Sequence, residues 1–323
     1  MRNKKIAQQI EGFRKKRVLL IGDSILDIYV YGKAIGKSLE TPTIVAREER
    51  TELSFGGAAL VARNILELGG SVSFFSVVGG DDEARHYQDF RHGNLDKHFF
   101  TDKTRRTTVK KRFWVDGYKL LQMDNLDNRD IDGALLEKIK EGLAAEIGKC
   151  DAVVISDYRH GMLTAGLISY VKSIAKERKK NIFVDSQISH REGNHALYAD
   201  CFMVLLSEKE AVSLDGKFAA SGGPAAFKKI SAILGKSNVC IKLGEAGSLC
   251  LVNGAAIRTG AIDAKAVDTC GAGDAFLAAL CLSSMEDIEN ALEIANVWAG
   301  LSTLAQGANP PKIGDLTKYL GKE

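Results

Sequence analysis

The sequence predicts an α/β fold in which helices cover both faces of a doubly wound, mostly parallel sheet that carries a small β lid. Three observations lead to this prediction. Apolar, strand-like runs alternate with amphipathic helical stretches, and two segments interrupt that alternation. A glycine-rich turn also precedes an apolar helix near the C-terminus. Regular alternation of strand and helix is typical of a parallel sheet covered on both faces.

The first half of the chain supplies two core strands and a helix between them. Residues 17–21 are an apolar run that ends at Gly22-Asp23, and residues 71–78 are a second one. Between them, residues 57–69 carry apolar side chains at helical spacing, namely Ala58, Val61, Ile65 and Leu68. We therefore expect strand, helix and strand in that order.

After Asp151 the alternation becomes regular. We expect strands at residues 152–156, 182–185, 201–206 and 239–243, with residues 248–252 as the hairpin partner of the last. We expect helices at residues 164–179, from Glu208 onward, at 273–284 and at 287–305.

Two segments differ from the rest of the chain. Residues 28–49 and 99–123 lack helical periodicity and are rich in Thr, Tyr, Val, Phe and charged residues. We interpret both as β-hairpin material outside the main sheet that together forms one lid. No flexible linker separates them from the core, so residues 1–323 are expected to form a single domain.

Composition excludes several classes of partner. The 44 basic and 41 acidic residues nearly balance, which gives no reason to expect a nucleic acid or a membrane surface as partner. The first residues lead into polar sequence, with neither the apolar segment of a signal peptide nor a run long enough to span a membrane. The six cysteines show no CxxC spacing and suggest buried free thiols. We therefore expect a soluble, cytoplasmic protein.

The most informative motif covers residues 266–276. It places small residues and two glycines at the start of a helix, with Asp274 beside the exposed amides. Amides at a helix start bind the negative charge of a phosphate, and an adjacent carboxylate can take a proton from an attacking hydroxyl. A glycine turn capped by Asp274 is the simpler alternative. The short motif alone favours that alternative, but the longer string Asp-Thr-x-Gly-Ala-Gly-Asp resembles a signature of the ribokinase-like (PfkB) sugar kinases, and this resemblance implies a phosphoryl-transfer site.

Two nucleotide-binding motifs are excluded. Residues 32–38 look like a P-loop, but three residues separate the glycines where the motif needs four, and no helical pattern follows. The first strand is not followed by G-x-G-x-x-G, so a dinucleotide site is unsupported.

Other candidates stand at strand ends, each with a structural alternative. Asp23 and Asp27 follow the first strand and could bind a polyol or simply close a turn; Gly56-Gly57 opens the next helix. Residues 242–247 suit a nucleotide phosphate or a plain hairpin turn. Lys110 and Arg112 share one face of a lid strand and suit a phosphate or carboxylate, although a solvated strand face is the commoner reason.

In this order the motifs resemble the PfkB, or ribokinase-like, family of carbohydrate kinases over essentially the whole chain. They are Gly-Asp-x-x-x-Asp, Gly-Gly-Ala-Ala, Lys-Leu-Gly-x-x-Gly and Asp-Thr-x-Gly-Ala-Gly-Asp. Within the family the chain looks most like the D-glycero-D-manno-heptose 7-phosphate kinases, through residues 23–32, 56–69, 107–113 and 156–158. The resemblance implies ATP-dependent phosphorylation of a sugar or sugar phosphate with Mg²⁺, and in some members a monovalent cation, by a protein that dimerises through its lid.

The resemblance also implies residue roles. Asp274 would be the base, and the amides of Gly271, Ala272 and Gly273 the anion hole. The sugar would contact Asp27, Gly56, Gly57, Lys110 and Arg112. The nucleotide would contact Lys242, Gly244, Gly247, Ser207, Thr269 and Asn296, and Glu208 would act on Mg²⁺ through water.

Four positions depart from the pattern of the heptose enzymes. Leu60 replaces an Asn that touches a sugar hydroxyl, and Leu205 replaces the Asn of an Asn-x-x-Glu motif. His160 and Gln187 each replace a Lys. These changes leave a second hypothesis open, a sugar- or nucleotide-binding protein that has lost catalysis. Retention of the base and the anion hole favours the kinase.

Overall fold

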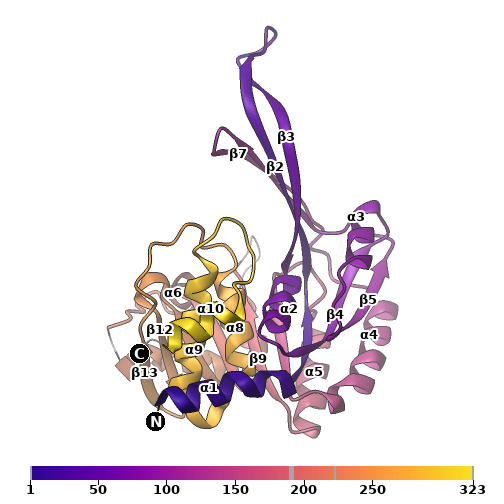
Figure 1. Ribbon diagram of the computed structural model, residues 1–323. Coiled ribbons are helices and arrows are strands. Elements are labelled where there is room, and N and C mark those ends of the chain that lie inside the picture. The colour runs from indigo at the N-terminus through magenta and orange to yellow at the C-terminus, as the bar shows by residue number, and fades with distance from the viewer. Residues whose placement is uncertain (1, 189–192, 222, 322–323) are drawn as a thin grey trace.

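A computed structural model describes residues 2–188, 193–221 and 223–321 (Figure 1). Within them the main sheet has nine strands, and those at one end (β11, β12 and β13) pair antiparallel while all other neighbours pair parallel. In spatial order the strands are β13 (Ala255–Thr259), β12 (Ser248–Val252), β11 (Asn238–Lys242), β10 (Met203–Ser207), β9 (Asn181–Ser186), β8 (Ala152–Asp157), β1 (Arg17–Gly22), β4 (Ser71–Gly79) and β5 (Leu95–Asp102).

Both faces of this sheet are buried. Successive side chains of a strand point to opposite faces, and in β1 they enter two separate cores: Val18 and Leu20 pack into one, Leu19 and Ile21 into the other. This explains why the core strands are continuous apolar runs, as expected for a parallel sheet between helical layers.

The helices divide between the two cores. One core receives α1 (Arg2–Gly12), α2 (Ala58–Glu67), α8 (Ala272–Leu282), α9 (Ile288–Ser302) and α10 (Ile313–Leu320). The other receives α4 (Gly133–Glu146), α5 (Ala165–Glu177), α6 (Glu208–Leu214) and α7 (Lys228–Leu234), and the short α3 (Asp82–Arg85) follows β4. Single 3₁₀ turns occur at Phe13–Lys15, His86–Gln88, Ile147–Lys149, His195–Tyr198, Gly223–Phe227, Gly244–Ala246 and Met285–Asp287.

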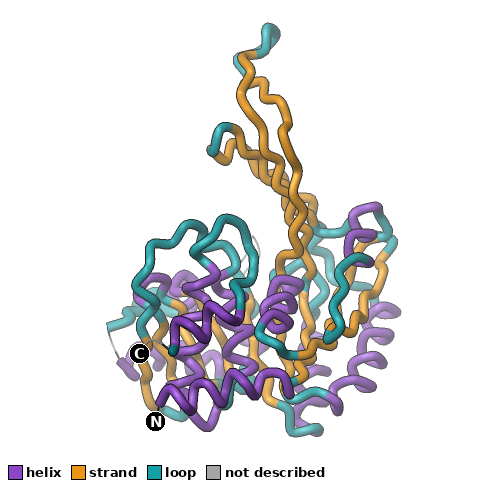
Figure 2. The backbone as a smooth tube through the Cα atoms, in the orientation of Figure 1, coloured by secondary structure: helices purple, strands orange, loops and turns teal. Residues whose placement is uncertain are grey.

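A second, smaller sheet forms the lid. Its strands lie in the order β3 (Ile44–Gly57), β2 (Ser24–Lys37), β6 (Val109–Val115) and β7 (Tyr118–Asn125), and only β2 and β6 pair parallel. The β2–β3 hairpin projects far from the body of the molecule (Figures 1 and 2). The predicted fold class, an α/β sheet with a β lid, is confirmed.

The predicted boundaries of the lid need correction. The first segment is longer than residues 28–49, because β2 begins at Ser24 and β3 continues to Gly57. The second begins later than residue 99, because residues 99–102 belong to β5 in the main sheet. Phe99 packs edge-on against Phe74 at 5.1 Å between ring centroids, so its apolar character serves the core. Alternation along the strand could not distinguish these two locations.

The predicted core strands and helices are present, with ends that differ by at most three residues. The prediction did not assign α1, α4 or β13. The excluded P-loop, residues 32–38, lies mostly in β2 and is followed by the hairpin turn instead of a helix.

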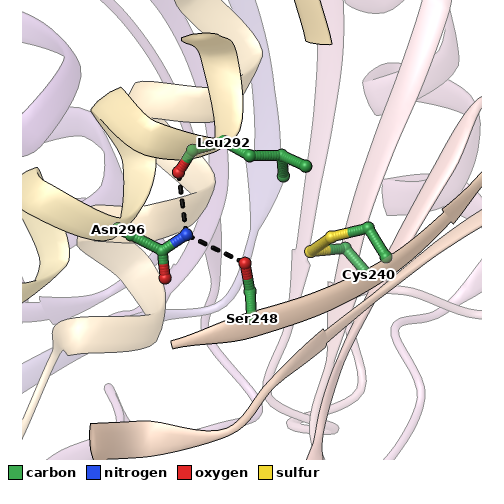
Figure 3. Close-up of a disulfide and its surroundings, with 5 residues drawn as sticks. Cys240, Ser248, Leu292 and Asn296 are labelled. Carbon is green, nitrogen blue, oxygen red and sulfur yellow. Dashed lines mark hydrogen bonds between the residues drawn. A yellow bond between two sulfur atoms is a disulfide. The ribbon is translucent and has the colours of Figure 1, made fainter. Parts of the chain in front are cut away.

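The expectation of six free thiols is wrong for one pair. Cys240 and Cys250 are directly opposite each other on the antiparallel strands β11 and β12, with their Cα atoms 4.1 Å apart, and form a disulfide (Figure 3). Register brings them together, and sequence spacing alone does not give register. Cys150, Cys201 and Cys281 are buried free thiols, as expected, whereas Cys270 is an exposed one.

Across the described ranges, no helix combines the length and the apolar character needed to cross a membrane.

Candidate active site

The largest group of predicted site residues lies around one cavity of about 460 Å³ at the carboxyl ends of the parallel strands. This is the edge where open α/β sheets bind ligands. Its lining includes all of the predicted base, anion-hole and sugar-binding residues: Asp27, Gly56, Gly57, Lys110, Arg112, Gly271, Ala272, Gly273 and Asp274. The structure therefore brings these predicted residues together around one cavity, from β2, β3, β6 and the start of α8.

A second cavity of about 200 Å³ adjoins the first and is mainly apolar. Lys242, Gly244, Thr269, Ala272 and Gly273 line both cavities. Gly247 and Asn296 line only the second, as predicted for the nucleotide side, whereas Ser207 lines only the first. The two cavities thus meet at the start of α8.

The start of α8 depends on a glycine. Gly271 is the N-cap residue and has φ +83°, a left-handed conformation that L side chains rarely adopt. A Cβ atom there would also lie 2.5 Å from Leu60 Cδ2. The Ala272 amide donates to the Thr269 carbonyl at 3.3 Å, while the Gly271 and Gly273 amides have no hydrogen-bond partner among the described residues. Two free amides at a helix start form an anion-binding site.

Asp274 lies in the first turn of α8 and is buried. The Tyr158 hydroxyl approaches both of its carboxylate oxygens, at 2.8 Å from Oδ1 and 2.9 Å from Oδ2. Burial raises the pKa of Asp274 to about 7, and the nearby charge of Asp185 adds to this effect. A carboxylate with a pKa near neutrality is well suited to accept a proton from a hydroxyl.

Asp27 is held by an ion pair that the sequence did not predict. Arg112 donates to its Oδ1 at 2.5 Å, and the two side chains are only 13% and 7% exposed. A Cβ atom on residue 56 would lie 2.0 Å from Asp27 Oδ2, so Gly56 leaves room for this carboxylate. Burial raises the pKa of Asp27, and the charge of Arg112 opposes the shift.

Lys110 shares the cavity face of β6 with Arg112, as predicted, but has different partners. Its Nζ lies 5.8 Å from the centroid of the Tyr158 ring, and none of the carboxylates in the described ranges lies within ion-pair distance of it. Arg112 is therefore paired with Asp27, whereas Lys110 lies beside the Tyr158 ring and lines the cavity.

Lys242, which lines both cavities, pairs with Asp185 at the end of β9. Burial alone would lower the pKa of Lys242, but the charges of Asp185 and Glu210 outweigh it and keep the amine protonated. Asn296 is oriented by its own amide, which donates to Ser248 Oγ at 2.9 Å and to the Leu292 carbonyl at 2.8 Å (Figure 3).

The structure does not bring Glu208 to either cavity. Glu208 is the exposed first residue of α6, whereas Glu210 is buried and lines the larger cavity. Ser207 and Glu210 form a capping box, with Glu210 Oε2 accepting from the Ser207 amide at 2.6 Å. Ser207 and Glu210 have the Asn-x-x-Glu spacing, two residues later than Leu205 and Glu208, and both line the larger cavity. Leu205 is a buried residue of β10, so no amide is missing there.

Metal binding has limited support in the side chains. The described residues contain no group of three His, Cys, Asp or Glu side chains arranged to hold an ion. The donor set fits Mg²⁺ only as an ion that keeps most of its waters and is carried by substrate phosphates. Glu210, facing the cavity, would hold one of those waters.

The remaining departures have separate consequences. Leu60 and Gln187 line the larger cavity and so alter what it can bind. His160 is buried, and its amide donates to Asp23 Oδ2 at 3.2 Å. Burial lowers the pKa of its ring to about 4, which keeps it neutral.

Tyr158, Asp185 and Glu210 also line the larger cavity, but they were not among the site residues predicted from the sequence. Tyr158 directly follows β8, Asp185 lies near the end of β9, and Glu210 lies in the first turn after β10. Position at the carboxyl end of a predicted parallel strand was the available signal. Asp23, by contrast, does not line the cavity; its Oδ2 accepts the Tyr158 amide at 3.0 Å.

A helix start with two free amides, a buried carboxylate and two adjoining cavities on an α/β scaffold are the features expected of a small-molecule kinase. The chain belongs to the pfkB family of carbohydrate kinases, whose model matches residues 15–313. It is therefore a carbohydrate kinase.

Its relatives include the Bifunctional protein HldE of Bradyrhizobium diazoefficiens, 30% identical over 324 aligned positions and 98% of this chain. The Helicobacter pylori P12 protein of the same name is 28% identical over 95% of the chain. The chain spans 64% and 67% of the lengths of these two relatives.

Solved structures share the fold at low identity. Escherichia coli phosphofructokinase-2 in complex with potassium has a TM-score of 0.73 and 18% identity, covering 95% of this chain and 99% of that one. Arabidopsis thaliana ribokinase complexed with ribose and ATP has a TM-score of 0.70 and 19% identity, covering 94% and 98%.

Proposed function

We propose that the protein transfers the γ-phosphoryl group of ATP to a hydroxyl of a sugar phosphate, with heptose 7-phosphate among the candidates. The observation that carries the proposal is the position of Asp274. This buried carboxylate lies beside the free amides at the start of α8, where the two cavities meet. ATP would occupy the apolar cavity and the sugar the larger one.

The geometry supports a direct transfer. Asp274 takes the proton of the attacking hydroxyl, whose oxygen bonds to the γ-phosphorus as the bond to the bridging oxygen breaks and ADP leaves. The amides of Gly271 and Gly273 stabilise the charge on the phosphoryl oxygens. Mg²⁺ on the phosphates would supply further charge neutralisation. The potassium named for phosphofructokinase-2 is a reason to include K⁺ in the assays.

Two features bear on the substrate. Lys110 supplies a cation that has no acidic partner among the described residues, which favours a phosphate or carboxylate on the sugar. Leu60, Ile25 and Ala308 form an apolar part of the wall. A substrate hydroxyl buried against that wall would lose its hydrogen bonds, which argues against any sugar whose recognition needs a hydroxyl contact there.

The proposal is tested by measuring ADP formation over a panel in which each sugar, heptose included, is paired with its phosphate. We expect turnover with at least one member and higher kcat/KM for the phosphorylated partner of each pair. Tight binding of sugars without turnover on any member would contradict the kinase and favour a binding protein.

Changing Lys110 to alanine tests the anion contact. We expect KM for the best phosphorylated sugar to rise about 10–100-fold, the range for a lost hydrogen bond to a charged group. KM for the matching neutral sugar should stay unchanged. Lys111→Ala is the matched control, because Lys111 lies on the same strand and does not line the cavity. Equal effects of the two changes would contradict the contact.

We further propose that two copies pair through their lids. Leu120, Leu121 and Met123 on β7 are 50%, 52% and 57% exposed, and Ile35 and Leu53 add apolar surface on β2 and β3. Exposed apolar patches on soluble proteins mark interaction sites, and a second lid offers a surface of the same kind.

Sedimentation velocity at micromolar concentration should give a dimer. The double change Leu121→Lys and Met123→Lys should give a monomer. Leu197→Lys is the control, because Leu197 is an exposed apolar residue outside the lid. A wild-type monomer at that concentration would overturn the proposed pairing.

A further inference from the structure

Tyr158 is placed at the centre of the proposed active site by its backbone. It follows the last residue of β8, and its amide donates to the buried Asp23 carboxylate at 3.0 Å. This anchors the start of the loop, while the Tyr158 side chain turns into the larger cavity. The backbone of Tyr158 is therefore anchored at Asp23, and its ring extends into the larger cavity.

The hydroxyl of Tyr158 lies almost equally far from the two oxygens of Asp274, at 2.8 and 2.9 Å. A single donor shared in this way restrains rotation of the carboxylate about χ2 of Asp274, a torsion angle that otherwise has a broad distribution. Burial, followed by the negative charge of Asp274, raises the pKa of the Tyr158 hydroxyl well above its usual value. The hydroxyl therefore keeps its proton and remains a donor throughout the range of an assay.

Other charged groups also act on Asp274. The acidic groups around it are Asp185 on β9 and Asp27 on β2, and the cations are Lys242 on β11 and Arg112 on β6. The thiol of Cys270 lies in the preceding loop. Within the described residues, Tyr158 is the only side chain that donates a hydrogen bond to the carboxylate itself.

We infer that Tyr158 is a positioning residue that orients the Asp274 carboxylate toward the substrate hydroxyl and stabilises its ionised form. The inference rests on the proposed role of Asp274 as the base. It assigns to residue 158 a function that acts on the base and not on the substrate.

The test compares Tyr158→Phe with the wild type and with Tyr198→Phe. Tyr198 is a matched control because its hydroxyl also donates to a buried aspartate, Asp157 Oδ2 at 2.7 Å, away from both cavities. In Tyr158→Phe we expect kcat to fall at least about 10-fold with little change in KM, as for an oriented group lost from the transition state. The acid limb of kcat/KM against pH should move up by about one unit, because the ionised base loses a donor.

Each outcome decides the inference. A Tyr158→Phe profile that overlies the wild type, or an equal shift in Tyr198→Phe, would overturn it. If Asp274→Asn stays active, the proposed base is wrong and the role of Tyr158 falls with it. An inactive Asp274→Asn together with an unshifted Tyr158→Phe would reject only the role of Tyr158.

A second variant covers the case in which Tyr158→Phe does not fold. Incorporating 3-fluorotyrosine at position 158 keeps the hydroxyl and makes it a stronger donor. The acid limb should then move to lower pH, opposite to the shift in Tyr158→Phe. An unmoved limb would overturn the inference.

Discussion

Replacing Asp274 by asparagine should lower kcat by at least about 10²–10⁴-fold, the contribution of a positioned general base, while nucleotide affinity is retained. The nucleotide cavity is lined by other residues, so binding of ATP should survive the change. The measurement is turnover on the best sugar from the panel, together with calorimetric titration of ATP. Turnover close to that of the wild type would contradict the assignment of the base.

The same variant should be more stable than the wild type above neutral pH. The pKa of Asp274 is raised in the folded state, so the unfolded chain ionises first as pH rises from about 4, and folding then pays for a buried charge. Asparagine removes that cost. Free energies of unfolding should therefore converge near pH 4 and favour Asp274→Asn by pH 8. A variant that is inactive but more stable cannot be inactive through unfolding.

Replacing Arg112 by alanine should destabilise the protein by about 3–5 kcal/mol, the usual effect of removing one partner from a buried ion pair. Asp27 would remain in a site where it is only 7% exposed on its side chain and has lost its cation. KM for the sugar should also rise, because the carboxylate loses the group that holds it in place.

Denaturant unfolding and steady-state kinetics measure these two effects. Lys111→Ala, on the same strand, should leave both near the wild-type values. Combining Arg112→Met with Asp27→Asn should recover part of the stability, since no unpaired charge is then buried, but should not recover KM. An Arg112→Ala protein that unfolds like the wild type would contradict the importance of this pair.

Much of the fold was predictable because the pattern of the core is local. Continuous apolar runs such as residues 152–156 and 239–243 gave strands close to β8 and β11. The location of Phe99 could not be predicted from its sequence neighbours. Its membership of β5 depends on packing against Phe74, which the alternation of residues along one strand does not report.

The candidate site could be predicted where its residues form a continuous sequence motif. It could not be predicted where residues distant in the sequence meet only in the folded chain. The string around Asp274 and the glycines before α2 supplied eight of the 21 residues that line the larger cavity. The bond from Tyr158 to Asp274 joins residues 116 positions apart, and that from Arg112 to Asp27 joins residues 85 apart. Neither spacing has a sequence signature.

Glu208 shows that the alignment of a degenerate motif can be ambiguous. The Asn-x-x-Glu motif lost its Asn, so its register had to be chosen with only one anchor residue, and two glutamates were available. In the structure Glu210, which forms a capping box with Ser207, lines the larger cavity and Glu208 does not.

The β2–β3 hairpin joins the core without a linker at either end. β2 begins two residues after β1 ends, and β3 runs directly into α2. A small rotation of the hairpin about its base, beside Asp27 and Gly56, would therefore produce a larger displacement at its tip. Beyond Asp27, the 10 remaining residues of β2 reach about 33 Å at the usual rise per residue, so a tilt of about 5° at the base moves the tip by about 3 Å. A spectroscopic label in the turn at residues 38–43 would report, amplified, on movements at the sugar cavity.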